Sequence, residues 1–474
     1  MTVLNYELQQ QIDAAFQNQK QYALELRTSD YKRRLAVLDR FERVFRDSKE
    51  KIYQSAAKDF AKPQAEVDMS EIMAVLAELK HVKKNLKKWM KPLSVKATFS
   101  FLGTFSKIMK EPKGVTLVVS PWNYPFNLTF GPMIWSIAAG NTVIIKPSEM
   151  TPHMSTVIAE IVDKAFQPNE VCLFQGEADV ASYLTSLPFD HIFFTGSPAV
   201  GKLVMASAAK NLTSVTLELG GKSPVIVDKT ANISKAVKSI AWGKFSNNGQ
   251  TCIAPDYLYV HESIKDQFIS EMTACIKKQY GLENDAKGNQ DYCKVVNDGH
   301  YRRISHLLAD AKDRGGQLIT GGQTDDNERF IAPTLIEGMS ADSAIMEEEI
   351  FGPLLPVITY KELRDVISYV NSRPKPLALY VFSSHKQSIE QILSETSAGD
   401  TCVNQTMMHF LHLNLPFGGV NNSGIGKSGG IWGFNAFSHE RSVLVDKFSS
   451  ASMLHPPYTP KVRKLIKWTI KLTT

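Results

Sequence analysis

Cysteine is scarce in this sequence, and the few cysteines present are widely spaced. They stand at positions 172, 252, 275, 293 and 402, and no two of them form a C-x-x-C pair. This number and spacing exclude a disulfide framework and a cysteine-rich metal site. No stretch reaches the roughly 18 uncharged apolar residues of a membrane-spanning helix, and the first residues contain no apolar run of the signal-peptide type. We therefore expect a protein of the reducing cytoplasm that holds no metal.

An excess of charge of one sign is also lacking. A formal net charge of +6 is small for a chain of 474 residues, so we do not expect a nucleic acid as the partner. Hydrophobic residues make up 43% and charged residues 22% of the chain, which is typical of a folded globular protein. At this length we expect two large domains joined by smaller elements.

The first part of the chain has the periodicity of helices and then changes abruptly. From residue 1 to about 90, apolar positions such as Leu35 and Leu38 recur at the spacing of one helical face. Residues 91–111 are instead rich in β-formers and contain Gly103. We predict helices followed by a hairpin that projects from the main body.

The middle of the chain alternates short apolar runs with helical segments. This pattern is typical of a parallel sheet covered by helices on both faces, and it occurs twice. The fold class is therefore α/β, with two doubly wound domains. The predicted strands are 115–119, 142–145, 171–174, 191–194 and 214–217 in the first series, and 224–228, one starting near 257 and 402–403 in the second.

Two strand ends of the first series carry residues suited to a nucleotide. After the fourth strand, Gly196, Ser197 and Gly201 form a turn that opens a helix, whose first N–H groups favour a phosphate. The turn is not the G-x-G-x-x-G fingerprint, and a plain strand-to-helix turn explains it equally well. After the second strand, Lys146 and Glu149 could bond ribose hydroxyls, although in isolation a surface ion pair is the simpler interpretation.

Cys252 stands in a glycine-containing loop between a helix and a strand. An isolated cysteine is usually a small core side chain. Here the loop and polar neighbours such as Gln250 and Thr251 provide the access and the donors that a reactive thiolate needs. The other four cysteines lie in apolar or helical surroundings. Cys252 is therefore the candidate reactive thiol.

Glu218 follows an apolar strand directly and is followed by Gly220 and Gly221. A carboxylate in such a place costs stability unless it is paired or has a function. Partial desolvation raises the pKa of a carboxyl group toward neutrality, as a general base requires. The glycines would let the backbone approach a ligand closely. Glu218 is therefore the candidate base.

Seven motifs follow one another along the chain: 121–125 (PWNYP), 146–149 (KPSE), 194–197 (FTGS), 217–222 (LELGGK), 249–252 (GQTC), 348–353 (EEIFGP) and 415–419 (LPFGG). Together they resemble the aldehyde dehydrogenase superfamily. The similarity extends from about residue 1 to 446, with the motifs in the family's order and spacing. Details at 252–257 and 404–410 resemble the class 3 branch, which includes fatty and aromatic aldehyde dehydrogenases. Asn421 and Asn422 depart from that branch, which tends to have smaller residues there.

The resemblance implies a covalent mechanism. Cys252 would attack the aldehyde carbonyl and form a thiohemiacetal, whose negative oxygen would be bound by the side-chain amide of Asn123 and the backbone N–H of Cys252. Hydride would pass to a nicotinamide and leave a thioester, and Glu218 would activate the water that hydrolyses it. No metal takes part.

The resemblance also implies a nicotinamide cofactor. Lys146 and Glu149 would bind the adenine-side ribose, and Glu349 the nicotinamide ribose. Because the Glu149 carboxylate repels a 2′-phosphate, we expect NAD to be preferred and NADP also to be accepted. The implied cofactor and cavity residues are Trp122, Lys146, Glu149, Gly196, Ser197, Gly201, Glu349 and Phe351.

The resemblance also implies a domain layout and a homodimer. A β hairpin and a late strand would form a bridging element that pairs two copies. The expected parts are an NAD(P)-binding domain (1–90 and 112–217), a catalytic domain (218–405), the bridging element (91–111 and 406–446) and a tail (447–474).

The substrate is less well defined than the chemistry. Met407, Met408, Phe410 and Leu411 indicate an apolar mouth and favour aliphatic or aromatic aldehydes, but such clusters are also ordinary packing. A CoA-acylating enzyme would use the same thiol without needing a carboxylate at Glu218. A non-catalytic binding protein on this fold would not need Cys252, Glu218 and Asn123 together.

The C-terminal tail is basic and predicts an amphipathic helix over 461–472. It would be about 18 Å long, too short to span the roughly 30 Å hydrocarbon core of a membrane. It could pack on the protein, cover the substrate entrance or lie on an anionic membrane as a peripheral contact. Val462, Leu465, Ile466, Thr469, Ile470 and Leu472 fall on one side at 100° per residue, and Arg463, Lys464, Lys467 and Lys471 fall opposite.

Overall fold

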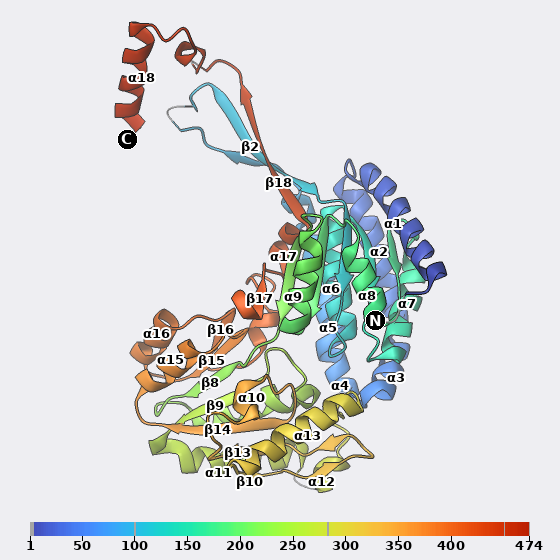
Figure 1. Cartoon of the computed structure of the whole chain (residues 1–474), viewed down its shortest axis with the longest axis vertical. Coiled ribbons are helices and arrows are strands. Elements are labelled where there is room, and N and C mark those ends of the chain that lie inside the picture. Colours follow the sequence, from blue (N-terminus) through green and yellow to red (C-terminus); the bar gives the residue numbers. More distant parts are fainter. Residues whose placement is uncertain (1–3, 99–100, 282–283, 450, 474) are drawn as a thin grey trace.

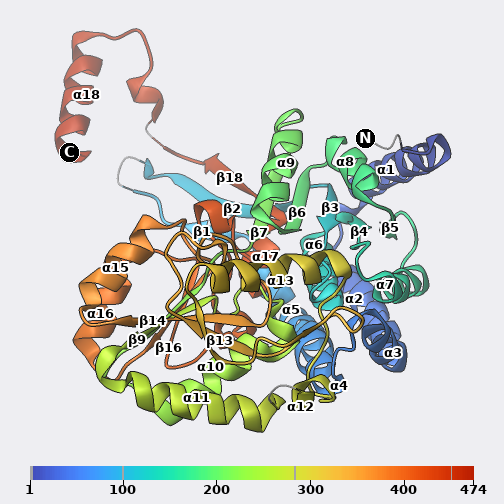
Figure 2. The same ribbon diagram turned by 60° about the horizontal axis from the view of Figure 1, so that its bottom comes forward.

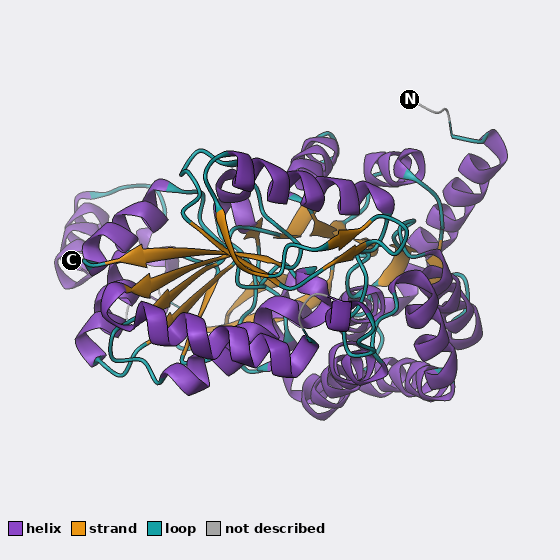
Figure 3. Ribbon diagram, turned by 90° about the horizontal axis from the view of Figure 1, so that it is seen from below, coloured by secondary structure: helices purple, strands orange, loops and turns teal. Residues whose placement is uncertain are grey.

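The computed structural model of the chain describes residues 4–98, 101–281, 284–449 and 451–473. Two α/β bodies lie against each other, and a long arm carries the C-terminal helix away from both (Figure 1). Seen from below, strands fill the middle of both bodies, with helices on either side (Figure 3). The predicted fold class, with two α/β domains, is confirmed.

The first body contains a six-stranded sheet. In spatial order, the strands are β17 (Gly424–Ile425), β7 (Ser214–Leu219), β6 (His191–Gly196), β3 (Val115–Val119), β4 (Thr142–Lys146) and β5 (Val171–Leu173). All are parallel except β17, which runs antiparallel to β7 and pairs Gly424 with Glu218. The five strands predicted for the first series are confirmed, whereas β17 comes from a segment that the sequence does not assign to this sheet.

Helices cover both faces of this sheet. They are α1 (Tyr6–Leu26), α2 (Tyr31–Asp47), α3 (Lys49–Phe60), α4 (Gln64–Val67), the π-helix η1 (Asp68–Ile72), α5 (Met73–Trp89), α6 (Pro125–Ala139), α7 (Pro152–Ala165), α8 (Ala178–Ser186), α9 (Pro198–Ala209) and α17 (Gly430–Ala436). Contacts place α1, α8 and α9 on one face and α6 and α7 on the other, with α2 and α5 packed behind α6. β3 and β4 are buried on both faces, as their continuous Val, Ile and Leu runs require.

The second body contains a seven-stranded sheet that is parallel except at one edge. In spatial order, the strands are β10 (Gln317–Thr320), β13 (Thr334–Glu337), β14 (Leu354–Tyr360), β9 (Tyr257–His261), β8 (Pro224–Val227), β15 (Ala378–Phe382) and β16 (Asp400–Val403). Only β10 is antiparallel to its neighbour, and β11 (Thr324–Asp325) pairs with β12 (Phe330–Ile331) in a separate ladder. The strands predicted at 224, 257 and 402 are therefore confirmed.

The helices of the second body form two apolar layers with its sheet. They are α10 (Ile233–Phe245), α11 (Lys265–Tyr280), α12 (Asn284–Lys287), α13 (Asp298–Asp313), α14 (Ala344–Glu347), α15 (Leu363–Ser372) and α16 (Lys386–Glu395). Its short 3-10 turns are η3 (Ser246–Gly249), η4 (Glu262–Ile264) and η5 (Met408–Leu411), whereas the turn η6 (Asn421–Ser423) contacts β7 of the first body.

The arm is a three-stranded antiparallel sheet of β1 (Leu93–Val95), β2 (Thr104–Pro112) and β18 (Ser438–Asp446). The predicted hairpin is confirmed by the pairing of β1 with β2. Of the expected bridging segment 406–446, only β18 reaches the arm, because β17 and α17 pack on the first body. After the arm come η7 (Ala451–Leu454) and α18 (Pro460–Thr473), and the turned view keeps α18 clear of both bodies (Figure 2).

The junction of the two bodies positions the candidate site. β7 ends at Leu219 and β8 begins at Pro224, so Glu218 lies where the chain leaves one sheet for the other. Among the described residues, no helix combines the length and apolar character that a membrane crossing requires. The described part of the chain also contains no group of three or more His, Cys, Asp and Glu side chains arranged to hold a metal ion.

Candidate active site

Cys252 sits in a tightly fixed loop after α10. Asn247 and Asn248 adopt left-handed backbone angles, with φ of +51° and +57°, which Asn tolerates better than most residues. The fully buried Gln250 holds the loop from within, because its side chain donates to Asn247 O at 3.0 Å and accepts from Val296 N at 2.9 Å. The thiol is therefore carried by a rigid loop rather than by a helix or a strand.

The electrostatic surroundings of Cys252 keep its thiol protonated. Burial raises the pKa of the Cys252 thiol, and the carboxyl groups of Glu349 and Glu218 raise it further. The backbone N–H groups of Cys252 and Ile253 act in the opposite direction. A reactive thiolate at this position needs a neighbouring base or positive charge during the reaction.

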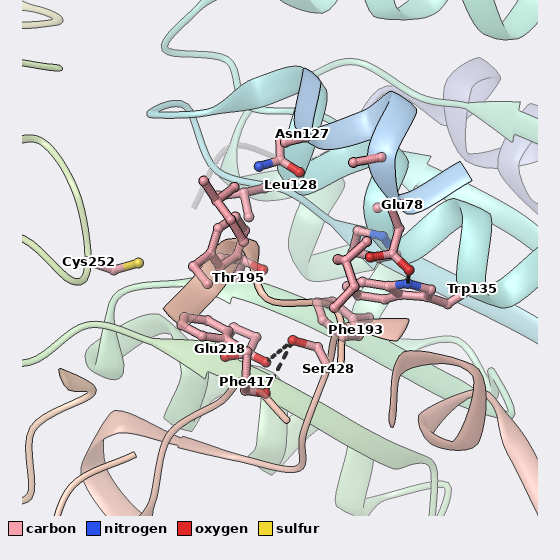
Figure 4. Close-up of a pocket in the computed structure, with 18 of the residues that line it drawn as sticks. Glu78, Asn127, Leu128, Trp135, Phe193, Thr195, Glu218, Cys252, Phe417 and Ser428 are labelled. Atoms are coloured by element: carbon pink, nitrogen blue, oxygen red, sulfur yellow. Dashed lines mark hydrogen bonds between the residues drawn. The ribbon is translucent and has the colours of Figure 1, made fainter. Parts of the chain in front are cut away.

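Glu218 is the penultimate residue of β7 rather than the residue after it, and its side chain is buried. Burial raises the pKa of the Glu218 carboxyl to about 8, in the direction expected from the sequence. The Ser428 hydroxyl donates to Glu218 Oε1 at 2.7 Å and opposes that rise (Figure 4). Glu218 Oε2 has no hydrogen-bond partner among the described residues. One carboxyl oxygen is therefore fixed, and the other is left for a ligand or water.

Asn123 lies next to the cysteine loop. Its side-chain Nδ2 donates to Gln250 O at 3.1 Å, and its own carbonyl accepts from Asn247 Nδ2 at 3.0 Å. An amide nitrogen carries two hydrogens, so this bond leaves one donor for another acceptor. The structure therefore places Asn123 against the loop that carries Cys252.

A buried ion pair supports the Asn123 segment, and the sequence does not reveal it. Lys62 and Glu71 are 3.0 Å apart with both side chains fully buried. Lys62 also donates to Asn123 O at 3.4 Å, and Glu71 accepts from the backbone N of Asn127 at 2.9 Å. Lys62 lies far from Asn123 in the sequence, in the short connection between α3 and α4, and an isolated charged side chain is usually solvated.

The cofactor-side cavity opens at the carboxyl ends of β6 and β7. It contains Cys252 and Glu218 together with Trp122, Gly196, Ser197, Glu349, Phe351 and Asn422. The Trp122 and Phe351 rings meet edge to face, with centroids 5.4 Å apart. Asn422, one of the two residues that depart from the class 3 pattern, therefore faces this cavity.

Glu349 and the start of α9 give this cavity the groups that a dinucleotide requires. Burial raises the pKa of the Glu349 carboxyl to about 8, and a Cβ at Gly220 would collide with that carboxyl. The hydroxyl of Ser197 caps α9 by accepting from Val200 N at 3.4 Å, and Pro198 and Ala199 line the cavity. A carboxyl for ribose hydroxyls and a helix N-terminus for phosphates fit a nicotinamide dinucleotide.

Three of the expected cofactor residues lie away from this cavity. Gly201 packs inside α9, where a Cβ would stand 2.7 Å from Leu219 Cδ2, so its small size serves helix-to-strand packing. Lys146 ends β4 and forms an ion pair with Glu149, and neither residue borders the cavity. Lys146 is buried and Glu149 is about two-fifths exposed.

A second, mostly apolar cavity reaches Cys252 from the other side. Of the expected apolar mouth, Met407, Phe410 and Leu411 line it, whereas Met408 is exposed. Burial raises the pKa of the Glu66 carboxyl, which also lines this cavity, to about 7. The remaining apolar wall consists of Met69, Tyr124, Leu128, Trp242 and Ile253.

Comparison with known proteins gives one consistent family. Residues 3–443 match the model described as the aldehyde dehydrogenase family. The chain is 40% identical over 432 residues to the dimeric NADP-preferring aldehyde dehydrogenase of Rattus norvegicus, covering 91% of this chain and 94% of that protein. It is 38% identical over 435 residues to aldehyde dehydrogenase family 3 member A2 of Pongo abelii, with 92% and 88% covered. The solved substrate-bound AldH of Staphylococcus aureus superposes with a TM-score of 0.92 at 40% identity, covering 97% of this chain and 99% of that one.

Proposed function

This chain belongs to the aldehyde dehydrogenase family, and from that premise we propose that Cys252 and Glu218 perform its chemistry. The reaction is the NAD(P)-dependent oxidation of an aldehyde to a carboxylate, and the resemblance to the class 3 branch is confirmed. The observation that supports the residue assignment is that the thiol and the Glu218 carboxyl border the same cavities, with Glu218 Oε2 unpartnered among the described residues.

Acylation uses Cys252, Glu218 and Asn123. Cys252 Sγ adds to the carbonyl carbon while the thiol proton passes to Glu218, and the aldehyde oxygen becomes an oxyanion. The second hydrogen of Asn123 Nδ2 and the backbone N–H of Cys252 donate to that oxygen, typically contributing about 3 kcal/mol per donor. The cofactor, when bound, accepts the hydride, and a thioester is left on Cys252.

Deacylation returns Glu218 to the role of base. Its Oε2 takes a proton from a water molecule, whose oxygen adds to the thioester carbon. Cleavage of the C–S bond leaves the Cys252 thiolate, which takes the proton of the acid, so the product departs as the carboxylate and the thiol is restored. Because Glu218 already holds the thiol proton after acylation, it must lose that proton first. This scheme distinguishes the enzyme from a CoA-acylating relative, which would not need the carboxylate.

Cofactor binding is assigned to groups from both bodies. Glu349 holds the nicotinamide-side ribose, and the α9 N-terminus at Gly196 and Ser197 faces the pyrophosphate, with Trp122 and Phe351 shaping the cavity. Lys146 and Glu149 complete the adenine-side edge. In this assignment the first body supplies the cofactor domain, and the second supplies the thiol.

Glu149 sets the preference for NAD. A panel of aliphatic and aromatic aldehydes, assayed with NAD and with NADP, should show turnover that favours apolar substrates and NAD. Replacing Glu149 with Gln removes a charge that repels a 2′-phosphate, worth about 1 kcal/mol across water. We expect kcat/KM with NADP, relative to NAD, to rise roughly fivefold. The exposed Glu177 at the start of α8 provides the matched control: Glu177→Gln should leave this ratio unchanged, and an equal rise in both variants would contradict the assignment.

The arm is proposed as the surface that pairs two copies into a homodimer. Large exposed apolar side chains gather on it, which a monomer rarely shows. The relative from Rattus norvegicus is named as dimeric, in keeping with this proposal. Light scattering on the full chain is expected to give the mass of two copies. The exposed side chains are Leu93, Val95, Phe101, Leu102, Phe105, Leu444, Val445 and Phe448.

The tail is proposed to lie on an anionic membrane surface. Helix α18 contacts η7, and it projects beyond the arm (Figure 1). Lys461, Arg463, Lys464, Lys467 and Lys471 are exposed, and no acidic residue lies in the helix. Val462, Leu465 and Ile466 are half-buried, Trp468 is exposed, and the side chain of Leu472 lies outside the described residues. A basic helix with one apolar side suits a surface of acidic lipids.

Truncation after Tyr458 tests the tail. We expect the full chain to bind vesicles containing an anionic lipid in a salt-sensitive manner, and the truncated chain to lose this binding with unchanged kinetics on short aldehydes. Neutral vesicles serve as the control. An altered KM for long-chain aldehydes without vesicle binding would make the tail an entrance cover, and a change in thermal stability alone would make it packing.

A further inference from the structure

A third cavity leads from Cys252 past Glu218 to a second carboxyl group, that of Glu78 on α5 (Figure 4). Ala74 and Ala77 of α5 and Gly131 of α6 leave this space open, because bulkier side chains there would fill it. Neither the cofactor cavity nor the apolar cavity includes Glu78. The proposed mechanism gives this space no role.

The end of this cavity near the thiol is suited to water. Thr195 Oγ1 and Glu218 Oε2 both border it, and neither has a hydrogen-bond partner among the described residues. Both residues are at least nine-tenths buried. Buried polar atoms without a protein partner are commonly satisfied by ordered water, which needs two or more such groups within reach.

During turnover the cofactor cavity, which Glu218 also borders, and the apolar cavity, which borders Cys252, are both filled. The dinucleotide occupies the cofactor cavity, and the chain of the aldehyde occupies the apolar cavity. Glu218 nevertheless has to release one proton after acylation and another after hydrolysis, because oxidation of an aldehyde by NAD and water yields two protons. The third cavity is the space that stays open beside Glu218 Oε2.

Glu78 is held rigidly where this space ends. Its Oε1 accepts from Trp135 Nε1 at 2.6 Å (Figure 4) and from the backbone N of Gly430 at 3.1 Å. One turn further along α5, His81 is half-buried, and its Nε2 would stand 3.2 Å from a Cβ at Gly430. Glu78 and His81 therefore flank the same glycine, with His81 toward the surface.

We propose that Glu78 receives the protons that Glu218 takes up, passed through water in the third cavity, and releases them toward solvent beside His81. This inference rests on the proposed role of Glu218. In each transfer the O–H bond of the Glu218 carboxyl breaks, a water molecule gains one proton and gives up another, and the Glu78 carboxylate becomes the acid. Glu78 then loses the proton to solvent, and no electrons move.

The surroundings of Glu78 favour an exchangeable proton. Burial raises the pKa of the Glu78 carboxyl to about 7, close to that of Glu218, and the two N–H donors limit the rise. From its own helix it faces His81, whose pKa is lowered by burial and then by Lys84. The other titratable groups that line the third cavity are Glu218 on β7 and Cys252 in the loop after α10, and α6 contributes the uncharged Trp135.

Glu78→Gln tests the proposal, because an amide oxygen still accepts from Trp135 and Gly430 but cannot take up a proton. We expect NADH formation in a single turnover to match the wild type, while steady-state kcat falls about tenfold. This is less than the roughly 100-fold contributed by a group that acts directly, since water can partly replace it. The solvent isotope effect on kcat should rise, and the inflection near pH 7 that the Glu78 carboxyl should give the wild-type kcat should disappear. Small buffer bases should restore part of the rate, because they can accept the proton from Glu218.

Trp135→Phe is the matched control, because it removes a bond to Glu78 while keeping the carboxyl. It should lower the melting temperature and retain the inflection in the pH profile of kcat. If Glu78→Gln has the wild-type pH profile and isotope effect, or if Trp135→Phe reproduces its kinetics, Glu78 is a structural residue and the proposal is overturned. Loss of single-turnover NADH in Glu78→Gln would also overturn it, whereas the same loss in the wild type would fault the assignments of Cys252 and Glu218 instead.

Discussion

Replacing Cys252 with Ala is expected to abolish aldehyde oxidation, lowering kcat by roughly 10⁴-fold or more. The thiol is the group that bonds to the substrate carbon, and the other cysteines lie elsewhere in the fold: Cys275 on α11 and Cys402 on β16 are examples. Binding of NAD should change little, because the dinucleotide contacts assigned above come from other residues. Steady-state NADH formation measures the first effect, and fluorescence titration with NADH measures the second.

The control for this prediction is a cysteine that borders none of the three cavities. Cys275 is half-buried on α11, so Cys275→Ala should keep nearly full activity. Near wild-type turnover by Cys252→Ala would refute the nucleophile. Loss of NAD binding together with activity would show instead that the 246–252 loop collapses without the thiol.

Replacing Glu218 with Gln is expected to slow hydrolysis of the thioester more than its formation, because the Cys252 thiol can also lose its proton to water. Gln keeps the shape and the contact with the Ser428 hydroxyl, but it cannot take a proton from water, so hydrolysis should slow by about 10²–10⁴-fold. The acyl group should then accumulate on Cys252. Intact-mass analysis after mixing with aldehyde and NAD checks this by the added mass of the acyl group, and Cys252→Ala in the same experiment should gain none.

The pH dependence of the wild type follows from the same carboxyl. The base acts in its ionised form, and burial raises the pKa of Glu218 to about 8, so the deacylation rate should increase as the pH rises through about 8. Glu218→Gln should lack this rise. An unchanged rate and profile in the variant would place the base elsewhere, with the buried Glu349 as the next carboxyl to test.

Much of the fold and part of the site follow from local sequence patterns. Strands buried on both faces, such as Val115–Val119, are continuous apolar runs, so they can be read directly. Glu218 and Cys252 stand out because polar or reactive residues interrupt such patterns at strand ends and in loops. The helical tail is likewise a periodic pattern and forms α18.

The remaining features of the fold and of the site depend on contacts between distant parts of the chain. Glu78 and Glu66 sit on helical segments, where a carboxylate is normally solvated, and only the packing of α6 and of the cysteine loop buries them. Gly201 looks like part of a phosphate turn, yet its small size is required by Leu219. The antiparallel strand β17 is two residues long, too short to leave a recognisable period.

The late arrival of β17 and α17 has a consequence for biosynthesis. The first body lacks part of its core until Phe434 and Phe437 emerge, because these rings complete the cluster around Trp135 and Phe193. On the ribosome, the strand that carries Glu218 therefore has an open edge while the whole second body is made, and unpaired edges invite association with other chains. Chains that terminate before residue 424 should be held by chaperones or aggregate. The core of the first body and the pairing of the strand that carries Glu218 are therefore completed only when the last part of the chain has been synthesised.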